Sequence, residues 1–451
     1  MARGKTKDMT VGSPMRHIIE FSVPLLLGFL FQQLYNVFDA MIVGRFVGLD
    51  ALAAVGSTGS VNFLIIGFCM GVCNGFSIPL AQRFGARDND GMKKYMMNAI
   101  YLSVFFAVIL TVVTVVFCKQ ILVAMDTPGD ILALSYNYIV IILAGIPVTF
   151  LYNLISGIIR AMGDSKTPVY FLVMSSVINI VLDLVLINVF SMGVVGAAVA
   201  TVVSQLVSGV CCVIYSYKRY ELLHVEKRFR KIDGRSMGKL LYVGIPMGLQ
   251  YSITAIGSVI LQKSVNSLGK VAVASMTAGG KVSMFFCCPY DAMGSTMATY
   301  GGQNIGAGKI DRLNKGLFSV SVLGVAYSII ALVFLAVAWK PLVSLFIGEG
   351  ESMDVYSNAH MVILYNALFY IPLAFVNIVR FLIQGMGYSQ IAIIAGICEM
   401  AARTFVGFML VPQFGFKAAC IASPVAWVMA DMFLFPAYFI IIKKMKRIAA
   451  R

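Results

Sequence analysis

Charged side chains are scarce in this chain, and their scarcity excludes an ordinary soluble protein. Asp, Glu, Lys and Arg make up 12% of the 451 residues, whereas hydrophobic residues make up 59% and the mean hydropathy is +0.87. A soluble globular chain carries about a quarter charged residues. Such a deficit is tolerated where most of the surface faces lipid. The composition therefore predicts an all-α integral membrane protein.

Histidine is also scarce, and its scarcity argues against an enzyme. The three histidines are His17, His224 and His360, and no nucleophile–base pair or metal-ligand set forms around them. The nine cysteines lie in or at the ends of apolar runs. Cys69 and Cys73 share a helix face, but no histidine or second pair completes a zinc set. We expect no catalysis, no redox role, no cofactor and no resident metal, with Na⁺ left open as a coupling ion.

The basic start of the chain, residues 1–16, is followed by an apolar stretch, as in a secretory signal peptide. That stretch continues past Gln32 and Asn36 to Val43 without an A-x-A-like cleavage site. We therefore expect a first transmembrane helix that is retained.

Long apolar segments recur along the whole chain. Each reaches the roughly 20 residues that cross a hydrocarbon core as a helix, and together they predict twelve transmembrane helices. The segments are 17–43, 52–82, 95–118, 131–158, 167–190, 193–217, 239–265, 272–302, 315–339, 355–384, 389–411 and 417–442.

The cations predict the orientation. If both termini are cytoplasmic, 26 of the 35 Lys and Arg residues fall in inward loops and six in outward loops, as the positive-inside rule requires. The formal net charge of +15 thus reflects membrane topology, because no basic stripe interleaved with aromatic residues suggests nucleic-acid binding. We expect a multi-pass protein of the cell membrane, a monomer, with membrane lipid as its surroundings.

An internal repeat organises the sequence. The offset between its two copies is nearly constant across most of each half, through polar loops as well as helices. An even number of helices per half makes the two copies parallel, related by an axis along the membrane normal. The matching pairs are Pro24 with Pro246, Ala81–Arg87 with Gly302–Gly308, and Arg160–Gly163 with Gln384–Gly387.

The repeat divides the chain into two lobes of six helices each around a central cavity. We assign residues 1–217 to the N-lobe and 239–451 to the C-lobe. Residues 218–238 form a polar, basic cytoplasmic linker, which we expect to be solvated and to contact anionic lipid head groups.

Twelve helices in two parallel halves, with a polar face on the first, resemble the multidrug and toxic compound extrusion (MATE) transporters, and in detail the prokaryotic DinF-like branch. The resemblance covers nearly the whole chain. It is most specific at Gln32–Asp39, at Arg160–Pro168, at Asn179-x3-Asp183 and at Thr201.

Intramembrane carboxylates cost about 2.5–3.5 kcal/mol each at mid-helix, so each needs a physical reason. Asp39, Asn179, Asp183 and Thr201 lie on three predicted helices that could share one pocket. Interhelical hydrogen bonding alone, at about 0.6 kcal/mol per bond, explains the amide and the hydroxyl. It does not explain two carboxylates without a basic partner in the same half, which must bind a cation or carry a proton.

The resemblance implies that these four residues form the cation-coupling site of the N-lobe, with H⁺ or Na⁺ as the ion. It also implies export of drugs, dyes and toxic metabolites. We hypothesise that ion entry from outside reshapes the first helix and expels the substrate outward. Pro24 is the expected bend, because it lacks a backbone donor.

A carboxylate-bearing pocket with amide and aromatic neighbours favours bulky organic cations, to which aromatic faces add about 0.5–2 kcal/mol of cation–π attraction. Candidate residues of the substrate cavity are Gln32, Tyr35, Asn36, Asn153, Ser156 and Ser176.

The C-half carries charges that can pair among themselves. Glu399 and Arg403 are four residues apart, so an intrahelical ion pair is the first explanation. A second interpretation adds Lys281 and makes Lys281, Glu399 and Arg403 a network that tunes substrate preference or gating. The absence of acidic residues on helices seven and ten, where the NorM-like branch places its ion site, favours coupling in the N-half.

Three other function classes fit the sequence less well. A flippase for lipid-linked precursors needs a cationic cavity, which Lys281 and Arg403 keep open, although the Asp39–Asn179–Asp183 set argues against it. A membrane-embedded enzyme lacks its catalytic set. A channel is disfavoured because the repeat predicts two lobes that move about a central site. The prediction is a secondary active multidrug efflux transporter that works by alternating access.

Overall fold

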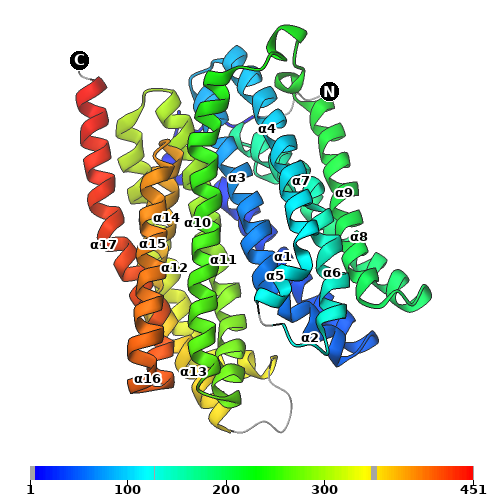
Figure 1. Ribbon diagram of the computed structural model, residues 1–451. Helices are drawn as coiled ribbons and strands as arrows, with labels where there is room; N and C mark the ends of the chain where they lie inside the picture. The colour runs from blue at the N-terminus through cyan, green and yellow to red at the C-terminus, as the bar shows by residue number, and fades with distance from the viewer. Residues whose placement is uncertain (1–5, 126, 347–352, 450–451) are drawn as a thin grey trace. The chain divides into compact units, whose positions relative to one another are not determined.

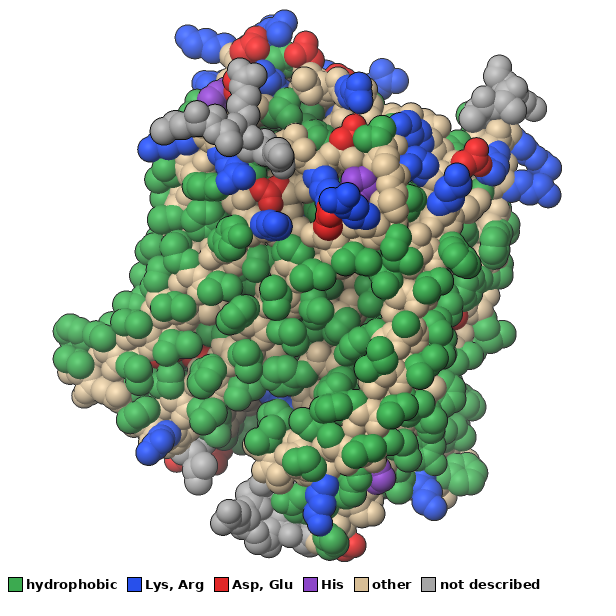
Figure 2. Space-filling model, turned by 180° about the vertical axis from the view of Figure 1, so that it is seen from behind, with side chains coloured by type: hydrophobic (Ala, Val, Ile, Leu, Met, Phe, Trp, Pro, Cys, Tyr) green, Lys and Arg blue, Asp and Glu red, His purple; other side chains and the backbone are tan. Residues whose placement is uncertain are grey.

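The computed structural model describes residues 6–125, 127–346 and 353–449, and in this part of the chain every regular element is helical (Figure 1). Each of the twelve expected segments is helical, so the all-α membrane fold is confirmed. Ten helices are long and apolar enough to cross a membrane alone, and two bent pairs raise the number to twelve among the described residues. In the face shown in Figure 2, hydrophobic side chains cover most of the surface, and the Lys and Arg side chains gather mainly toward the top and the bottom of the view.

The chain divides into two compact units. The N-unit comprises Val23–Ser252 with the short stretch that ends at Met9, and the C-unit comprises Thr10–Ser22 with the chain from Ile253 onward. The first half of the chain forms α1 (Pro14–Phe46), α2 (Leu49–Ser57), α3 (Gly59–Gly85), α4 (Asn89–Val116), α5 (Cys118–Ala124), α6 (Leu132–Ala144), α7 (Ile146–Ala161), α8 (Lys166–Leu184), the π-helix η1 (Val185–Val189) and α9 (Gly193–Arg219).

The second half follows a similar order. Two short 3₁₀ turns, η2 (Glu221–Leu223) and η3 (Lys227–Phe229), lead into it. It forms α10 (Gly234–Asn266), α11 (Lys270–Gly306), α12 (Ile310–Ser344), α13 (Met353–Leu368), α14 (Tyr370–Gly385), α15 (Ser389–Phe405), the π-helix η4 (Val406–Leu410), α16 (Val411–Phe414) and α17 (Phe416–Ala449).

Irregular features recur at the offset of the predicted repeat. The pair α6 and α7 bends by 45°, and the pair α13 and α14 bends by 52°. A proline, Pro147 or Pro372, follows each break and removes a backbone donor from the helix that begins there. The π-helices η1 and η4 likewise occupy matching places in the two halves, each directly after the helix that carries the buried acidic residue Asp183 or Glu399. Because helix breaks depend on local sequence, this agreement supports the repeat.

The boundary between the compact units differs from the predicted repeat boundary at 218–238. It falls inside α1, between Ser22 and Val23, and inside α10, between Ser252 and Ile253. Each half of the chain therefore contributes part of its first helix to the other unit.

Hydrogen bonds and close backbone packing explain the two exchanged segments. In the C-unit, Lys309 Nζ donates to Thr10 O over 2.8 Å, and the hydroxyls of Ser22 and Thr296 lie 2.7 Å apart. In the N-unit, the first part of α10 packs against α3 at glycines. A Cβ at Gly75 of α3 would lie 2.5 Å from the Cα of Gly244, so no larger residue fits this crossing.

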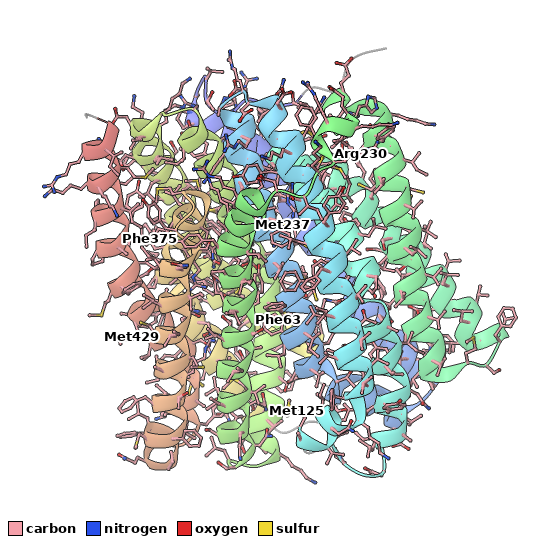
Figure 3. All side chains as sticks on the ribbon, turned by 45° about the horizontal axis from the view of Figure 1, so that its top comes forward. Phe63, Met125, Arg230, Met237, Phe375 and Met429 are labelled. Carbon is pink, nitrogen blue, oxygen red and sulfur yellow. The ribbon has the colours of Figure 1, made fainter. Side chains whose placement is uncertain are left out.

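The linker between the halves binds α4 of the N-unit. Lys94 Nζ lies 3.0 Å from Asp233 Oδ1, and Lys93 Nζ lies 3.4 Å from Glu226 Oε1. Asp233 also accepts a hydrogen bond from the backbone N–H of Ser236 over 2.8 Å, at the start of α10. Figure 3 labels Arg230 in the linker and Met237 in the first turn of α10. The linker is thus partly ordered by ion pairs, and the predicted lipid contact stays a prediction.

Candidate functional site

The predicted coupling residues meet in the N-unit, where α1, α8 and α9 supply them. Asp39 of α1 is 9% exposed, and Asn179 and Asp183 of α8 are 1% and 0% exposed. Thr201 of α9 accepts a hydrogen bond from Asn179 Nδ2 over 3.3 Å. The carboxyl groups of Asp39 and Asp183 lie close enough to share a hydrogen bond. The structure therefore brings all four residues together.

Thr201 has a different role from the other three. Its hydroxyl donates to the carbonyl of Ala197 over 3.0 Å and accepts from Asn179. The hydroxyl of Tyr35 lies 3.2 Å from the same oxygen. These bonds occupy the hydrogen-bonding capacity of one hydroxyl, so Thr201 holds the amide of Asn179 and the phenol of Tyr35 in place.

The site has more buried acceptors than donors. Among the described residues, no hydrogen-bond donor reaches Asp39 Oδ1, Asn179 Oδ1 or either carboxylate oxygen of Asp183. Buried polar atoms without partners are rare in folded proteins, because each costs about 1–3 kcal/mol. A bound proton or cation would satisfy these four oxygens, because a group of acceptors without donors can hold either one.

Two features of this site were not predicted as part of it. Tyr138 of α6 lies within electrostatic reach of both Asp39 and Asp183, and its position depends on how α6 packs on α9. The π-helix η1 begins two residues after Asp183. π-Helices are rare and often occur at functional sites. The sequence gives no signal for either feature.

The candidate substrate-cavity residues lie on α1, α7 and α8. Asn153 Nδ2 donates to Thr149 O over 2.9 Å and Ser176 Oγ donates to Leu172 O over 3.0 Å, each within its own helix. Asn36 is exposed, whereas Ser156 is buried. Gln32 and Tyr35 are half-buried on α1. Their shared role in substrate binding stays a prediction.

Pro24 lies inside α1, which continues as one helix from Pro14 to Phe46. The division of α1 between the C-unit and the N-unit falls one residue before Pro24. A proline cannot donate to the carbonyl four residues earlier, so the helix has one backbone bond fewer near this division. The predicted bend at Pro24 stays a prediction.

The C-unit contains a buried ion-pair cluster whose members differ from the predicted network. Glu399 is 3% exposed, and its carboxylate contacts the guanidinium of Arg380 on α14. The predicted partner, Arg403, lies 3.7 Å from Glu399. Lys281 is exposed and makes no ion pair with any residue that the structure describes. Arg380 could have been included from the sequence, since it is a cation inside an apolar segment.

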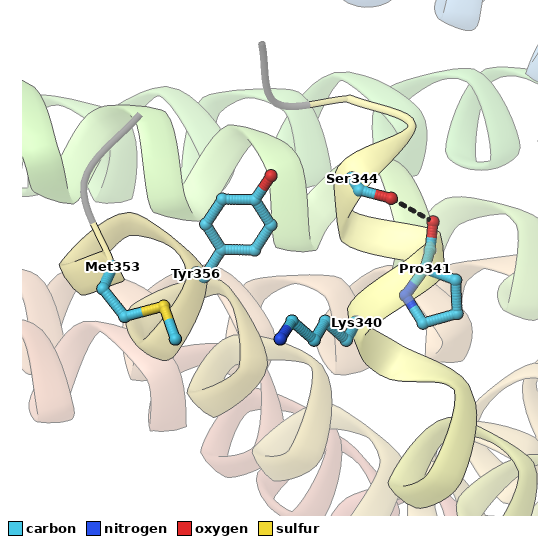
Figure 4. Close-up of a pocket in the computed structure, with 5 residues that line it drawn as sticks. All are labelled: Lys340, Pro341, Ser344, Met353 and Tyr356. Carbon is cyan, nitrogen blue, oxygen red and sulfur yellow. Dashed lines mark hydrogen bonds between the residues drawn. The ribbon is translucent and has the colours of Figure 1, made fainter. Parts of the chain in front are cut away.

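A surface pocket of about 370 Å³ lies in the C-unit, between the end of α12 and the start of α13 (Figure 4). The described residues that line it are Lys340, Pro341, Ser344, Met353 and Tyr356. Ser344 Oγ donates to Pro341 O over 2.8 Å at its edge.

Comparison with known proteins identifies the family of this chain. The family model MatE matches residues 24–185 and 246–409. The chain belongs to the MatE family. The two matched segments begin at Pro24 and Pro246, which are the proline pair of the internal repeat, so the family model recognises the same two halves.

Relatives and solved structures of MatE proteins cover most of the chain. It is 30% identical over 376 residues to the probable multidrug resistance protein YoeA of Bacillus subtilis (strain 168), covering 81% of this chain and 80% of the relative. It is 31% identical to YpnP of the same organism, another probable multidrug resistance protein, covering 77% and 78% of the two chains.

A solved structure, an outward-facing conformation of a multidrug resistance MATE family transporter, superposes with a TM-score of 0.90 at 23% identity. The match covers 99% of this chain and 100% of that one. At this identity the structure shows the fold alone, which is that of a MATE transporter. Assignment to the DinF-like branch stays a prediction.

Proposed function

We propose that this MatE protein is a secondary active multidrug efflux transporter that exports organic, mostly cationic compounds in antiport with H⁺ or Na⁺ by alternating access. The family and the names of the relatives, which are multidrug resistance proteins, support this function. The observation that carries the coupling is the excess of buried, unpartnered acceptors at Asp39, Asn179 and Asp183.

The geometry supports either coupling ion by a different route. For Na⁺, the four oxygens of Asp39, Asn179 and Asp183 that no donor among the described residues reaches provide hard ligands of the kind that such cations prefer. For H⁺, two carboxyl groups within hydrogen-bonding reach favour a state in which one proton is shared between them, as in other carboxylate pairs. In both cases the bound ion removes negative charge from the site.

Loss of that negative charge provides a physical basis for exchange. An organic cation is attracted to the ionised Asp39–Asp183 pair, and the phenol ring of Tyr35 adds an aromatic face beside it. When H⁺ or Na⁺ binds, this attraction falls and the substrate is released. A change of α1 near Pro24 would couple ion binding to the outward release that we propose.

The placement in the cell membrane with both termini cytoplasmic is part of the same proposal. It rests on the cations of the sequence. Among the Lys and Arg residues assigned to the cytoplasmic side, Arg3, Lys5 and Arg451 lie outside the described residues. We also propose that the protein acts as a monomer in contact with membrane lipid.

Dye efflux from proteoliposomes, with Na⁺ and proton gradients imposed separately, tests the proposal. We expect one gradient to drive efflux, and we expect Asp39→Asn to reduce gradient-driven efflux to background while the protein still inserts. Asp50→Asn, at an exposed carboxylate in the first turn of α2, is the matched control and should transport normally. Wild-type efflux by Asp39→Asn would contradict the coupling site. A lack of response to both gradients would remove the coupled exporter and favour the flippase.

A further inference from the structure

The C-unit contains a set of five ionisable groups in or near its interior. Their helices come from different parts of the second half of the chain, and no part of the proposed N-unit coupling site is among them. The groups are Asp291 of α11, Arg380 of α14, Glu399 and Arg403 of α15, and Asp431 of α17.

Arg380 is at the centre of this set. Its guanidinium contacts the carboxylate of Glu399 and acts electrostatically on both Asp291 and Asp431. Arg403 adds a second guanidinium, 3.7 Å from Glu399. With every group ionised, three carboxylates face two guanidiniums, which leaves one uncompensated negative charge. Because arginine stays protonated in proteins, only a carboxylate can remove that charge.

Among the three carboxylates, Asp431 is the buried one that forms no ion pair in the described part of the chain. Glu399 has two guanidiniums beside it, and Asp291 is exposed on α11 rather than buried among the other helices. Asp431 is 9% exposed, and its Oδ1 has no hydrogen-bond donor among the described residues. An ionised carboxylate in such surroundings is costly, whereas the protonated form is neutral.

The surroundings of Asp431 provide one compensating charge. Among the described residues, Arg380 is the charged group that acts electrostatically on it, and that guanidinium already contacts Glu399. On α17 itself, Lys417 and Lys443 lie toward the two ends of the helix, roughly 20 Å away along the axis at about 1.5 Å per residue. The other helices packed on α17 include α12 and α13, and none of their ionisable groups acts on Asp431. These groups are Asp311, Arg312, Lys315, Tyr327 and Lys340 of α12, and Asp354, Tyr356, His360 and Tyr365 of α13.

From this geometry we propose that Asp431 is a second proton-binding carboxyl group of the transporter, located in the C-unit and separate from the Asp39 site. Uptake of one proton from water converts its carboxylate to the acid and makes the five-group set neutral. Release of the proton restores the negative charge beside Arg380. The proposal goes beyond the proposed coupling site and does not require it.

A proton site here would connect protonation to helix packing within the C-unit. Arg380 acts on Glu399, Asp291 and Asp431, which belong to three different helices. When Asp431 is ionised, it competes with Glu399 for the guanidinium of Arg380. When Asp431 is protonated, this competition ends and Arg380 pairs with Glu399. Proton binding at α17 would therefore strengthen the contact between α14 and α15.

The sequence offers a fluorescent reporter for this site. The chain has two tryptophans, Trp339 and Trp427. Trp427 is 8% exposed and lies one turn before Asp431 on α17, where residues four apart are neighbours on one helix face. Trp339 stacks on His360, with ring centroids 4.1 Å apart, so Trp339→Phe removes an unrelated response to pH. In that background, indole emission reports on the surroundings of Asp431 alone.

The test is a pH titration of Trp427 emission in the purified, detergent-solubilised Trp339→Phe protein, from about pH 5 to about pH 9. We expect a single sigmoidal change, and we expect Asp431→Asn in the same background to lose it. Asp39→Asn in this background should keep it, whatever the outcome of the dye-efflux experiment. A change that persists in Asp431→Asn, or one produced by Na⁺ at constant pH instead of by protons, would overturn the proposal.

Direct proton counting provides the second measurement. When the unbuffered proteins are moved across the same pH range, the Trp339→Phe protein should release about one proton per chain more than its Asp431→Asn derivative. Equal release by the two proteins would show that Asp431 stays in one protonation state and would overturn the proposal. Gel filtration of both proteins establishes that the asparagine variant is folded.

Discussion

The crossing of α3 and α10 allows a stability prediction from one interatomic distance. In Gly75→Ala, the new Cβ would lie 2.5 Å from the Cα of Gly244 and 3.0 Å from the carbonyl oxygen of Val243. Two carbon atoms reach their optimal contact at about 3.5–4.0 Å, so the helices would have to separate by about 1 Å. All the obstructing atoms belong to backbone, which cannot rotate away. Overpacking of this kind typically costs about 1–3 kcal/mol.

Thermal unfolding in detergent measures this cost. Gly280→Ala is the matched control, because Gly280 lies on α11 with nothing within 4 Å of its would-be Cβ. Alanine is favoured over glycine in a helix by up to about 1 kcal/mol, so we expect Gly280→Ala to melt at or above the wild-type temperature and Gly75→Ala to melt below it. Equal melting temperatures for the two variants would refute the close crossing.

Two further predictions concern ion pairs. Arg380→Gln should destabilise the protein by about 3–5 kcal/mol, because it leaves Glu399 buried without its main partner. The double variant Arg380→Gln with Glu399→Gln should recover part of this loss. If the double variant is destabilised as much as the single variant or more in melting experiments, the pairing is contradicted. Ser236 and Lys94 lower the pKa of Asp233 from its usual 3.8 to about 2, so its ionised form stabilises the linker above the usual pKa, and that contribution is lost as the pH falls through about 2. The difference in melting temperature between wild type and Asp233→Asn should therefore be constant from alkaline pH down to about pH 5 and shrink only below about pH 4. If this difference in melting temperature changes near neutral pH instead, the titrating group is not Asp233.

Much of the fold could be predicted because lipid imposes a simple length and polarity requirement on each helix. The expected segment 193–217 corresponds to α9 at Gly193–Arg219, and 239–265 corresponds to α10 at Gly234–Asn266. The breaks within segments could not be predicted in the same way. Hydropathy averages over a window, so the interruption at Thr58 and the bend after Ala144 leave no mark on it.

The N-unit site was more predictable than the C-unit cluster, and the reason is electrostatic. Asp39 and Asp183 have no basic residue in the apolar segments of their half, so a shared site was the economical explanation. In the C-half, helical spacing connected Glu399 with Arg403, whereas the three-dimensional fold gave Glu399 a closer partner in Arg380, on the preceding helix. Which of the two arginines lies closer to Glu399 depends on how α14 packs on α15. The spacing of residues along one helix does not contain that information.

The exchanged segments of α1 and α10 have a consequence for how such a chain can be divided or can arise. A cut in the linker leaves Thr10–Ser22 on the first fragment, although the unit to which this segment belongs is formed by the second. The same cut leaves the part of α10 up to Ser252 on the second fragment, although that part belongs to the N-unit. Neither fragment contains a complete unit, so each needs the other to finish its fold. A half-length ancestor with the same packing would have met this requirement as a pair of identical chains that exchange the first parts of their first helices. Fusion of the two copies would then have made that exchange permanent within a single polypeptide.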